Sequence, residues 1–195
     1  MRLSKPILME GKYDGITRTL VRDIITFFKY QREGEYSLPE DLTGEEEYEF
    51  PNLNKKFSIF LDLQLDEKVN GIDVDAEYWD DEEIIYLTII SNPNSKYNIL
   101  QDLIQELNEI LRHELEHIKQ YEQGYNFPKE PKSHEKYYIQ QHELEAQRAG
   151  FKRRSKQENI PFEKVVRDWF EKNKNKYKMN PEQVERVIKK IINNE

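Results

Sequence analysis

Residues 113–117 read His-Glu-Leu-Glu-His, which is the spacing of an H-E-x-x-H motif. Residues i and i+4 of a helix share one face, so His113 and His117 can bind the same metal ion while Glu114 lies beside it. Imidazole nitrogen and carboxylate oxygen suit zinc, which at catalytic sites keeps one position of its tetrahedral shell for water. All four histidines of the chain, at positions 113, 117, 134 and 142, fall in one short window. The pattern therefore predicts a metal site built on residues 113–117.

The apolar residues around the motif predict the helix that carries it. Between Asn98 and Tyr121 they recur at helical spacing, at Leu100, Leu103, Ile104, Leu107, Ile110, Leu111, Ile118 and Tyr121. At about 100° per residue, Glu114 falls roughly 20° from the centre of this stripe, and both histidines lie at its edge. A solvated, charged helix face is the ordinary interpretation of such a motif, but an unpaired carboxylate on the core side is costly to bury. The helical phase therefore favours a metal site.

A catalytic zinc normally has three protein ligands, so one has to come from outside the motif. The metzincin continuation H-E-x-x-H-x-x-G-x-x-H is excluded, because Gln120 and Gln123 occupy its glycine and last histidine positions. The next candidates lie in residues 142–150, and they are Glu143, Glu145 and His142.

The helical neighbours of these three candidates rank them. Small or apolar residues stand at i−4, i+3 and i+7 from Glu143, namely Ile139, Ala146 and Gly150. Such a surface lets two helices approach closely enough for a short carboxylate to reach a metal. Glu145 is flanked instead by Gln141 and Arg148, as on a solvated ion-pair face. We rank Glu143 first, Glu145 second and His142, which also faces the predicted packing side, third.

Residues 142–150 resemble the second helix of gluzincin-type metallopeptidases, a group of HExxH zinc peptidases (zincins) in which a glutamate in an E-x-x-A context completes the zinc site. The resemblance implies that Glu143, three residues before Ala146, is the third ligand. It also implies one Zn2+ per chain, held by His113, His117 and Glu143. Gln147 stands where many relatives carry an aspartate. The activity implied is endopeptidase hydrolysis of a protein or peptide substrate.

In a peptidase of this kind, zinc polarises the scissile carbonyl, and Glu114 takes a proton from the attacking water and later delivers it to the leaving amine. An extended substrate is expected to dock on the sheet by strand addition. The oxyanion needs an electrophilic helper, for which the candidates by proximity in sequence are His134, Tyr137 and Tyr138. The alternative is a non-catalytic zinc-binding protein that uses its basic C-terminal helices to bind a partner. A purely structural site has no use for a general base, which speaks against this alternative.

The rest of the pattern predicts an α+β fold whose first half contains the sheet. An amphipathic helix is expected at residues 14–33, followed by a polar, acidic loop at residues 33–54. Three strands are expected near 57–65, 72–79 and 84–90, because apolar residues alternate or run together there. The Asn70-Gly71 pair predicts a two-residue hairpin, and hence an antiparallel three-stranded meander.

Helices make up the second half. The motif helix is expected to begin at a cap near Asn98 and to end at Gly124. A glutamate helix at about 134–157 follows, and further helices begin near Pro161 and Pro181. This order resembles the zincin core. We predict a metallopeptidase domain at 1–157 and a helical extension at 158–195.

Composition excludes several classes of function. Among 195 residues there is no cysteine, so disulfides, a thiolate nucleophile and cysteine-based zinc sites are excluded. The first thirty residues contain neither a signal sequence nor a membrane span, so a cytoplasmic protein is expected. The net charge is −8, but residues 152–195 hold 13 basic and 7 acidic side chains, which leaves −14 on the remainder. An acidic body disfavours nucleic-acid binding by the core. The basic C-terminal part either engages an acidic partner, weakly a nucleic acid, or folds back on the acidic body.

Overall fold

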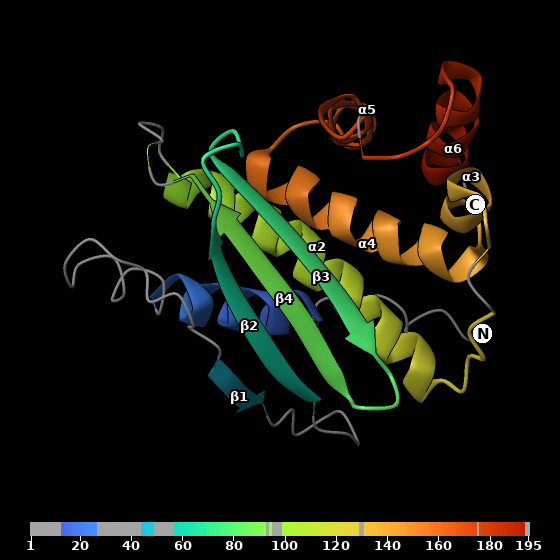
Figure 1. The fold of residues 1–195 in the computed structure, drawn as a ribbon. Coiled ribbons are helices and arrows are strands. Elements are labelled where there is room, and N and C mark those ends of the chain that lie inside the picture. Colours follow the sequence, from blue (N-terminus) through green and yellow to red (C-terminus); the bar gives the residue numbers. More distant parts are fainter. Residues whose placement is uncertain are drawn as a thin grey trace.

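The computed structural model describes residues 13–26, 44–48, 57–92, 94, 99–128, 131–174 and 176–193 (Figure 1). These residues form an α+β fold with a mixed sheet and a set of helices, so the predicted class is confirmed. Residues 13–26 are helical, in agreement with the helix expected from residue 14 onward. The remainder of that predicted helix lies outside the described residues. The polar loop expected at residues 33–54 is wrong at residues 44–48, which form a strand because their backbone pairs with a neighbouring strand, a contact that a polar composition does not reveal.

The sheet contains three long strands and a short one. The strands are β1 (Gly44–Tyr48), β2 (Phe57–Leu65), β3 (Ile72–Trp79) and β4 (Ile84–Ser91). Their order is β1-β2-β4-β3, with β2 and β4 parallel and the other two neighbouring pairs antiparallel. The predicted antiparallel three-stranded meander is therefore wrong, because β4 lies between β2 and β3 and leaves β3 at the edge of the sheet.

The connection between β2 and β3 explains this order. Strands two places apart are separated by about 9.5 Å, twice the distance that a two-residue hairpin bridges. Gly71 adopts the positive φ (85°) typical of a tight turn, but it ends a longer loop, residues 66–71. The end of β4 is bonded into that loop, where Asn92 Nδ2 donates to the carbonyl oxygens of Glu67 and Val69, each at 2.9 Å. The loop thus holds β2 and β3 apart with β4 between them.

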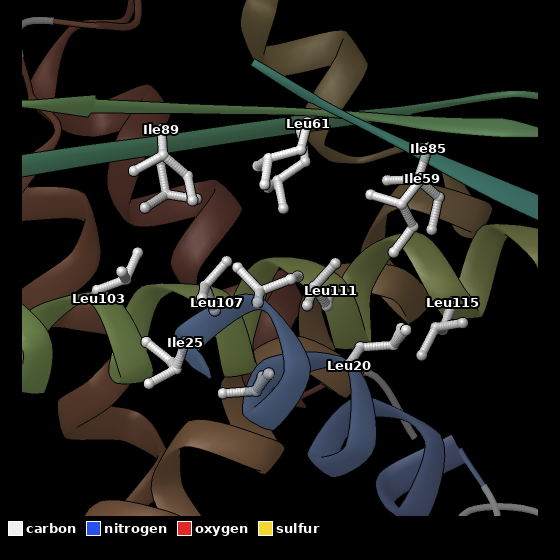
Figure 2. Close-up of a cluster of buried hydrophobic side chains, with 14 of the residues drawn as sticks. Leu20, Ile25, Ile59, Leu61, Ile85, Ile89, Leu103, Leu107, Leu111 and Leu115 are labelled. Atoms are coloured by element: carbon white, nitrogen blue, oxygen red, sulfur yellow. The ribbon is translucent and has the colours of Figure 1, made fainter. Parts of the chain in front are cut away.

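The main core lies between one face of this sheet and two helices, α2 (Ile99–Glu122) and the helix at 13–26 (Figure 2). Alternate residues of the strands face α2, and every fourth residue of α2 faces the strands, as the periods of the two elements require. The fully buried members of this core are Leu20, Ile85, Leu87, Ile89, Leu103, Leu107, Leu111 and Leu115. The core fixes the rotation of α2 about its axis, and with it the direction of the motif side chains.

The boundaries of α2 agree with the predicted motif helix. Gly124 follows its last turn with a φ of 79°, and its backbone N–H donates to the carbonyl oxygen of Tyr121 at 2.9 Å. The expected C-terminal cap is therefore confirmed. The cap expected at Asn98 lies outside the described residues.

The predicted glutamate helix is divided in two, as α3 (His134–Tyr138) and α4 (Gln141–Glu158). Gln140 interrupts the helix with extended backbone angles (φ −64°, ψ 143°). The break lets α4 lie along α2 while α3 takes a different direction (Figure 1). The single helix expected at about 134–157 is therefore wrong. The spacing of apolar residues continues across a turn of only two residues and so does not reveal it.

The last two helices are α5 (Phe162–Lys172) and α6 (Pro181–Asn193), which begin where the two prolines predict. Together with α4 they enclose a second core, formed by Leu144, Phe151, Val165, Val166, Phe170, Val187, Ile188 and Ile191. Because α4 contributes to this second core and also packs on α2, it joins the two halves of the described chain. The division into domains at residue 157 stays a prediction.

Basic residues of the C-terminal part fold back on the acidic body. Lys172 pairs with Glu106 of α2, and Arg154 pairs with Glu109 at 2.8 Å. Lys176, just after α5, pairs with Asp73 at the start of β3. These ion pairs neutralise part of the positive charge of the C-terminal part with part of the negative charge of the remainder. Within the described ranges, no helix combines the length and the apolar character needed to cross a membrane.

The close approach of α2 and α4 depends on Gly150, and replacing it with alanine should destabilise the fold. A Cβ at Gly150 would lie 2.7 Å from the backbone carbonyl oxygen of Glu109. We expect Gly150→Ala to lower the free energy of unfolding by about 1–3 kcal/mol, because overpacking forces the two helices apart. Gly15→Ala is the matched control, since a Cβ there meets nothing within 4 Å, and it should be neutral or stabilising. Urea denaturation of both variants measures the difference, and equal stability would contradict the close contact.

Candidate metal centre

Two helices bring the predicted ligands together. His113 and His117 lie one turn apart on α2, and their Nε2 atoms are 3.0 Å from each other. Glu143, in the first turn of α4, reaches both of them, with Oε1 at 3.4 Å from His117 Nε2 and Oε2 at 3.7 Å from His113 Nε2. One ligand atom from each residue falls within a group no wider than 4.8 Å. His113, His117 and Glu143 therefore form a buried group that could hold a metal ion.

Gln120 orients His117 and determines which of its nitrogens carries the proton. The Gln120 side-chain amide donates to the carbonyl oxygen of His142 at 3.0 Å and to Glu145 Oε2 at 3.2 Å. Its Oε1 therefore accepts, and it lies 3.0 Å from His117 Nδ1. Because Nδ1 must donate to this oxygen, Nε2 of His117 keeps its lone pair, and this lone pair faces Glu143 and His113. Histidines that bind a metal typically donate the N–H of their other ring nitrogen to an acceptor in this way.

Burial keeps both imidazoles neutral. It lowers the pKa of His117 to about 4 and the pKa of His113 well below its ordinary value, and the neighbouring His117 lowers the latter further. At neutral pH each ring can thus offer a lone pair to a cation without first losing a proton. Two neutral nitrogens and one carboxylate are a donor set that fits zinc, with a fourth side left open.

Glu114 lies next to the ligand group but outside it. It is only 4% exposed, as the helical phase predicts. The backbone N–H of Tyr78 in β3 donates to its Oε2 at 2.9 Å, and its Oε1 lies 3.8 Å from His113 Nε2. Burial, followed by the repulsion of the Glu143 carboxylate, raises the pKa of Glu114 well above its ordinary value. A carboxyl group with a raised pKa, held beside a cation site, holds a proton more readily than an exposed one, which suits a group that accepts and then returns a proton.

The other two candidates for the third ligand occupy different places. Glu145 accepts hydrogen bonds from Gln120 and from Gln141, the latter at 2.6 Å, and so acts on His117 only through Gln120. His142 is close to Glu143, with its Nε2 at 3.4 Å from Oε1, but it is not a member of the three-residue ligand group. The ranking of the three candidates by helical neighbours matches this arrangement.

The tyrosines of α3 are near the centre, whereas the histidine of α3 is not. The Tyr137 hydroxyl donates a hydrogen bond to Glu143, and burial raises the pKa of Tyr137 above its ordinary value. Burial also raises the pKa of Tyr138, to about 12. Both tyrosines line the cleft described next, but exposed His134 does not. The role of Tyr137 or Tyr138 as an oxyanion helper stays a prediction.

The ligand group opens into a cleft of about 500 Å3 between β3, α2 and α4. His113, Glu114 and Glu143 line one part of it. Asp73 and Lys176 line another part, where their ion pair joins β3 to the segment after α5. The edge strand thus runs along the cleft beside the ligand group.

Three features of the centre were not predicted. In the sequence, Gln120 is noticed only as a departure from the metzincin pattern. Its i+3 spacing from His117 could have indicated a hydrogen bond between the two side chains. The Tyr78 N–H that holds Glu114 is a backbone group and leaves no signal in the sequence. Gln147 lines the cleft, and its buried amide has no hydrogen-bond partner among the described residues.

Comparisons with known proteins did not identify a relative of this chain. A scan against models of protein families found no match to the chain, and searches of curated proteins and of solved structures found none either. What can be concluded about function therefore comes from the geometry of the chain itself.

Proposed function

We propose that the chain is a zinc-dependent peptidase with a zincin-like core. The observation that carries this proposal is the convergence of His113, His117 and Glu143 on one point, with Glu114 beside them but outside the ligand group. A structural zinc site is usually closed by four side chains, often cysteines, and gains nothing from a neighbouring free carboxyl group. A catalytic site needs three ligands, an open side and a general base.

The ligand group would hold the ion through His113 Nε2, His117 Nε2 and the Glu143 carboxylate. When bound, zinc supplies a Lewis acid that polarises a carbonyl and lowers the pKa of water. Gln120 keeps the His117 ring in the ligating tautomer, and the Tyr137 hydroxyl orients Glu143. Both contacts reduce the motion of the ligands, which favours binding of a small cation.

Glu114 performs the proton transfers. Its Oε2 is fixed by the Tyr78 N–H, so Oε1 is the oxygen that accepts a proton from the attacking water. The same oxygen then delivers this proton to the nitrogen of the leaving amine. Because β3 is the edge strand and lines the cleft, an extended substrate can lie along it and present its carbonyl next to Glu114.

Zinc affinity of two glutamate variants tests the ligand set. Glu143→Ala should weaken zinc binding by more than about 100-fold, because a ligand is lost, whereas indirect partners cost about 10–100-fold. Glu145→Ala should change it by less than about tenfold, since Glu145 contacts only Gln120 in this network. Competition with a chromogenic chelator measures both affinities. If Glu145→Ala were the weaker binder, the third ligand would be assigned wrongly by two residues.

A further inference from the structure

Gln147 is a buried amide for which the fold supplies no partner. The residue is only 6% exposed, and neither Nε2 nor Oε1 has a hydrogen-bond partner in the part of the chain that the structure describes. Burying an unpaired donor and acceptor destabilises a folded protein, so such groups call for an explanation. Gln147 lies one turn after Glu143 on α4 and lines the cleft. A molecule bound in the cleft would thus lie beside a side chain whose two polar atoms are buried and lack a partner among the described residues.

Support of the metal ligands does not explain Gln147. His117 already donates its Nδ1 hydrogen to Gln120 of its own helix, and Glu143 accepts a hydrogen bond from Tyr137. A carboxamide offers one acceptor and two donors, which matches the C=O and N–H of a peptide group. The chemistry of Gln147 thus fits the main chain of a bound peptide.

The opposite wall of the cleft carries uncompensated negative charge. Asp75, Glu77 and Asp80, all in or next to β3, line the cleft and form no ion pair with a described residue. By contrast, Lys176, which also lines the cleft, is already paired with Asp73. Carboxylates without counter-ions in a concave site raise the local concentration of cations and favour basic side chains.

We propose that the cleft between β3 and α4 binds an extended peptide segment with basic side chains, whose main chain pairs with the Gln147 carboxamide. This inference rests on the proposed peptidase function and adds the class of substrate to it. Gln147 is then a positioning residue for the substrate, and the carboxylates of β3 determine its charge preference.

We call the part of the cleft that would hold this peptide the subsite. Two ion pairs mark its end and so determine its length. Lys172–Glu106 and Lys176–Asp73 join the C-terminal segment to α2 and β3 at the end of the cleft away from His117. Glu106 and His113 are seven residues apart on α2, which corresponds to about 10 Å along the helix axis. An extended chain advances about 3.3 Å per residue, so about three residues fit between the ligand group and this end.

Hydroxamate probes test the proposal without requiring a known substrate. Acetohydroxamate engages the metal alone, whereas tripeptide hydroxamates add a main chain that reaches the subsite. Two such peptides, Ala-Lys-Ala and Ala-Glu-Ala, are each prepared with the hydroxamate at the N-terminal or the C-terminal end. Affinities for the zinc-loaded full chain are measured by calorimetry for wild type, Gln147→Met and the control Gln157→Met, an exposed glutamine of the same helix.

We expect Gln147→Met to bind acetohydroxamate as the wild type does. Of the two Ala-Lys-Ala hydroxamates, the one that wild type binds more tightly should bind to Gln147→Met about tenfold more weakly. Wild type should prefer the Lys peptide to the Glu peptide by at least about tenfold, and the double variant Asp75→Asn/Glu77→Gln should lose most of this preference. Gln157→Met should match wild type throughout. Equal affinity of wild type and Gln147→Met for the Lys peptide, or a preference for the Glu peptide, would overturn the proposal.

Two further measurements separate this inference from the peptidase proposal. If wild type binds neither zinc nor acetohydroxamate, the proposed function fails. The peptide subsite is then tested by binding of the Ala-Lys-Ala amide to the metal-free chain. Gln147→Met should still weaken this binding. Thermal unfolding tests the unpaired amide itself. Gln147→Met should be at least as stable as wild type, because methionine buries no polar group, and a clear loss of stability would mean that the amide is already bonded in the free protein.

Discussion

Glu114→Gln should abolish peptide hydrolysis while leaving the fold and the zinc content unchanged. Glu114 is buried and lies outside the ligand group, so its replacement removes no metal ligand. The amide oxygen of glutamine can still accept the hydrogen bond from the Tyr78 N–H, but the amide cannot take a proton from water. We expect the rate to fall by about 10²–10⁴-fold, the usual cost of losing a general base. Cleavage of a proteome-derived peptide library, analysed by mass spectrometry, measures the loss and also finds substrates.

Glu122→Gln is the matched control, because Glu122 is an exposed glutamate of the same helix. It should cleave the library as the wild type does. Unfolding curves of Glu114→Gln should coincide with those of wild type or lie at higher temperature, since the variant removes a buried carboxyl group that Glu143 repels. A substrate cleaved equally fast by wild type and Glu114→Gln would exclude the proposed proton transfers.

His117→Ala should remove the metal and the stability that comes with it. His117 contributes one of the three candidate ligand atoms, its Nε2. The hydrogen bond between Gln120 and Nδ1 leaves the lone pair of this Nε2 free for a metal. A ligand that binds only the native state stabilises it, by about 4 kcal/mol when present at 1,000 times its dissociation constant. We expect about one zinc per chain in the wild type and almost none in the variant.

Metal analysis by mass spectrometry and thermal unfolding with and without a chelator check this result. The chelator should lower the unfolding temperature of wild type toward that of the variant and leave the variant unchanged. His134→Ala serves as the control, because His134 is exposed and does not line the cleft. Full zinc content in His117→Ala would remove the basis of the ligand assignment.

The motif helix and the relative placement of two candidate ligands, His113 and His117, could be predicted from the sequence because both depend on the helical period. Within a single helix the angle between side chains is fixed at about 100° per residue. The position of Glu114 on the apolar side of α2 therefore follows from the leucines around it, without knowledge of any other element. The same reasoning applies to Gly124, whose lack of a side chain permits the positive φ that ends the helix.

The third candidate ligand, Glu143, reaches the other two only if two helices lie close together, and the sequence indicates that distance only indirectly. Small residues beside Glu143 marked the side of α4 that can approach another helix. In the structure this side meets α2, where Gly150 lies against the backbone of Glu109. The break at Gln140 was not predicted, because a turn of two residues changes neither composition nor apolar period.

Strand order was decided by the tertiary structure. Alternation of apolar residues indicates which face of a strand is buried, but it contains no information on which strand lies next to it. Gly71 was correctly identified as a turn residue, yet the turn belongs to a loop long enough for β4 to enter between β2 and β3. The position of β3 at the edge, and hence along the cleft, follows from that entry.

Gln120 and Gln147 illustrate the same limit at the scale of single side chains. Both are buried glutamines on the helices that carry the candidate ligands, and the sequence does not show which partners each one finds on the other helix. Packing of α4 on α2 brings Glu145 and the backbone carbonyl of His142 within reach of Gln120, whose other partner, His117 Nδ1, lies one turn away on the same helix. The same packing leaves Gln147 at the edge of the cleft. The sequence by itself determined the faces of the helices and the chemistry of the motif, because both are properties of one element. The hydrogen bonds between different elements were decided only by the tertiary structure, because hydrogen bonds form over about 3 Å and so depend on how separate elements pack.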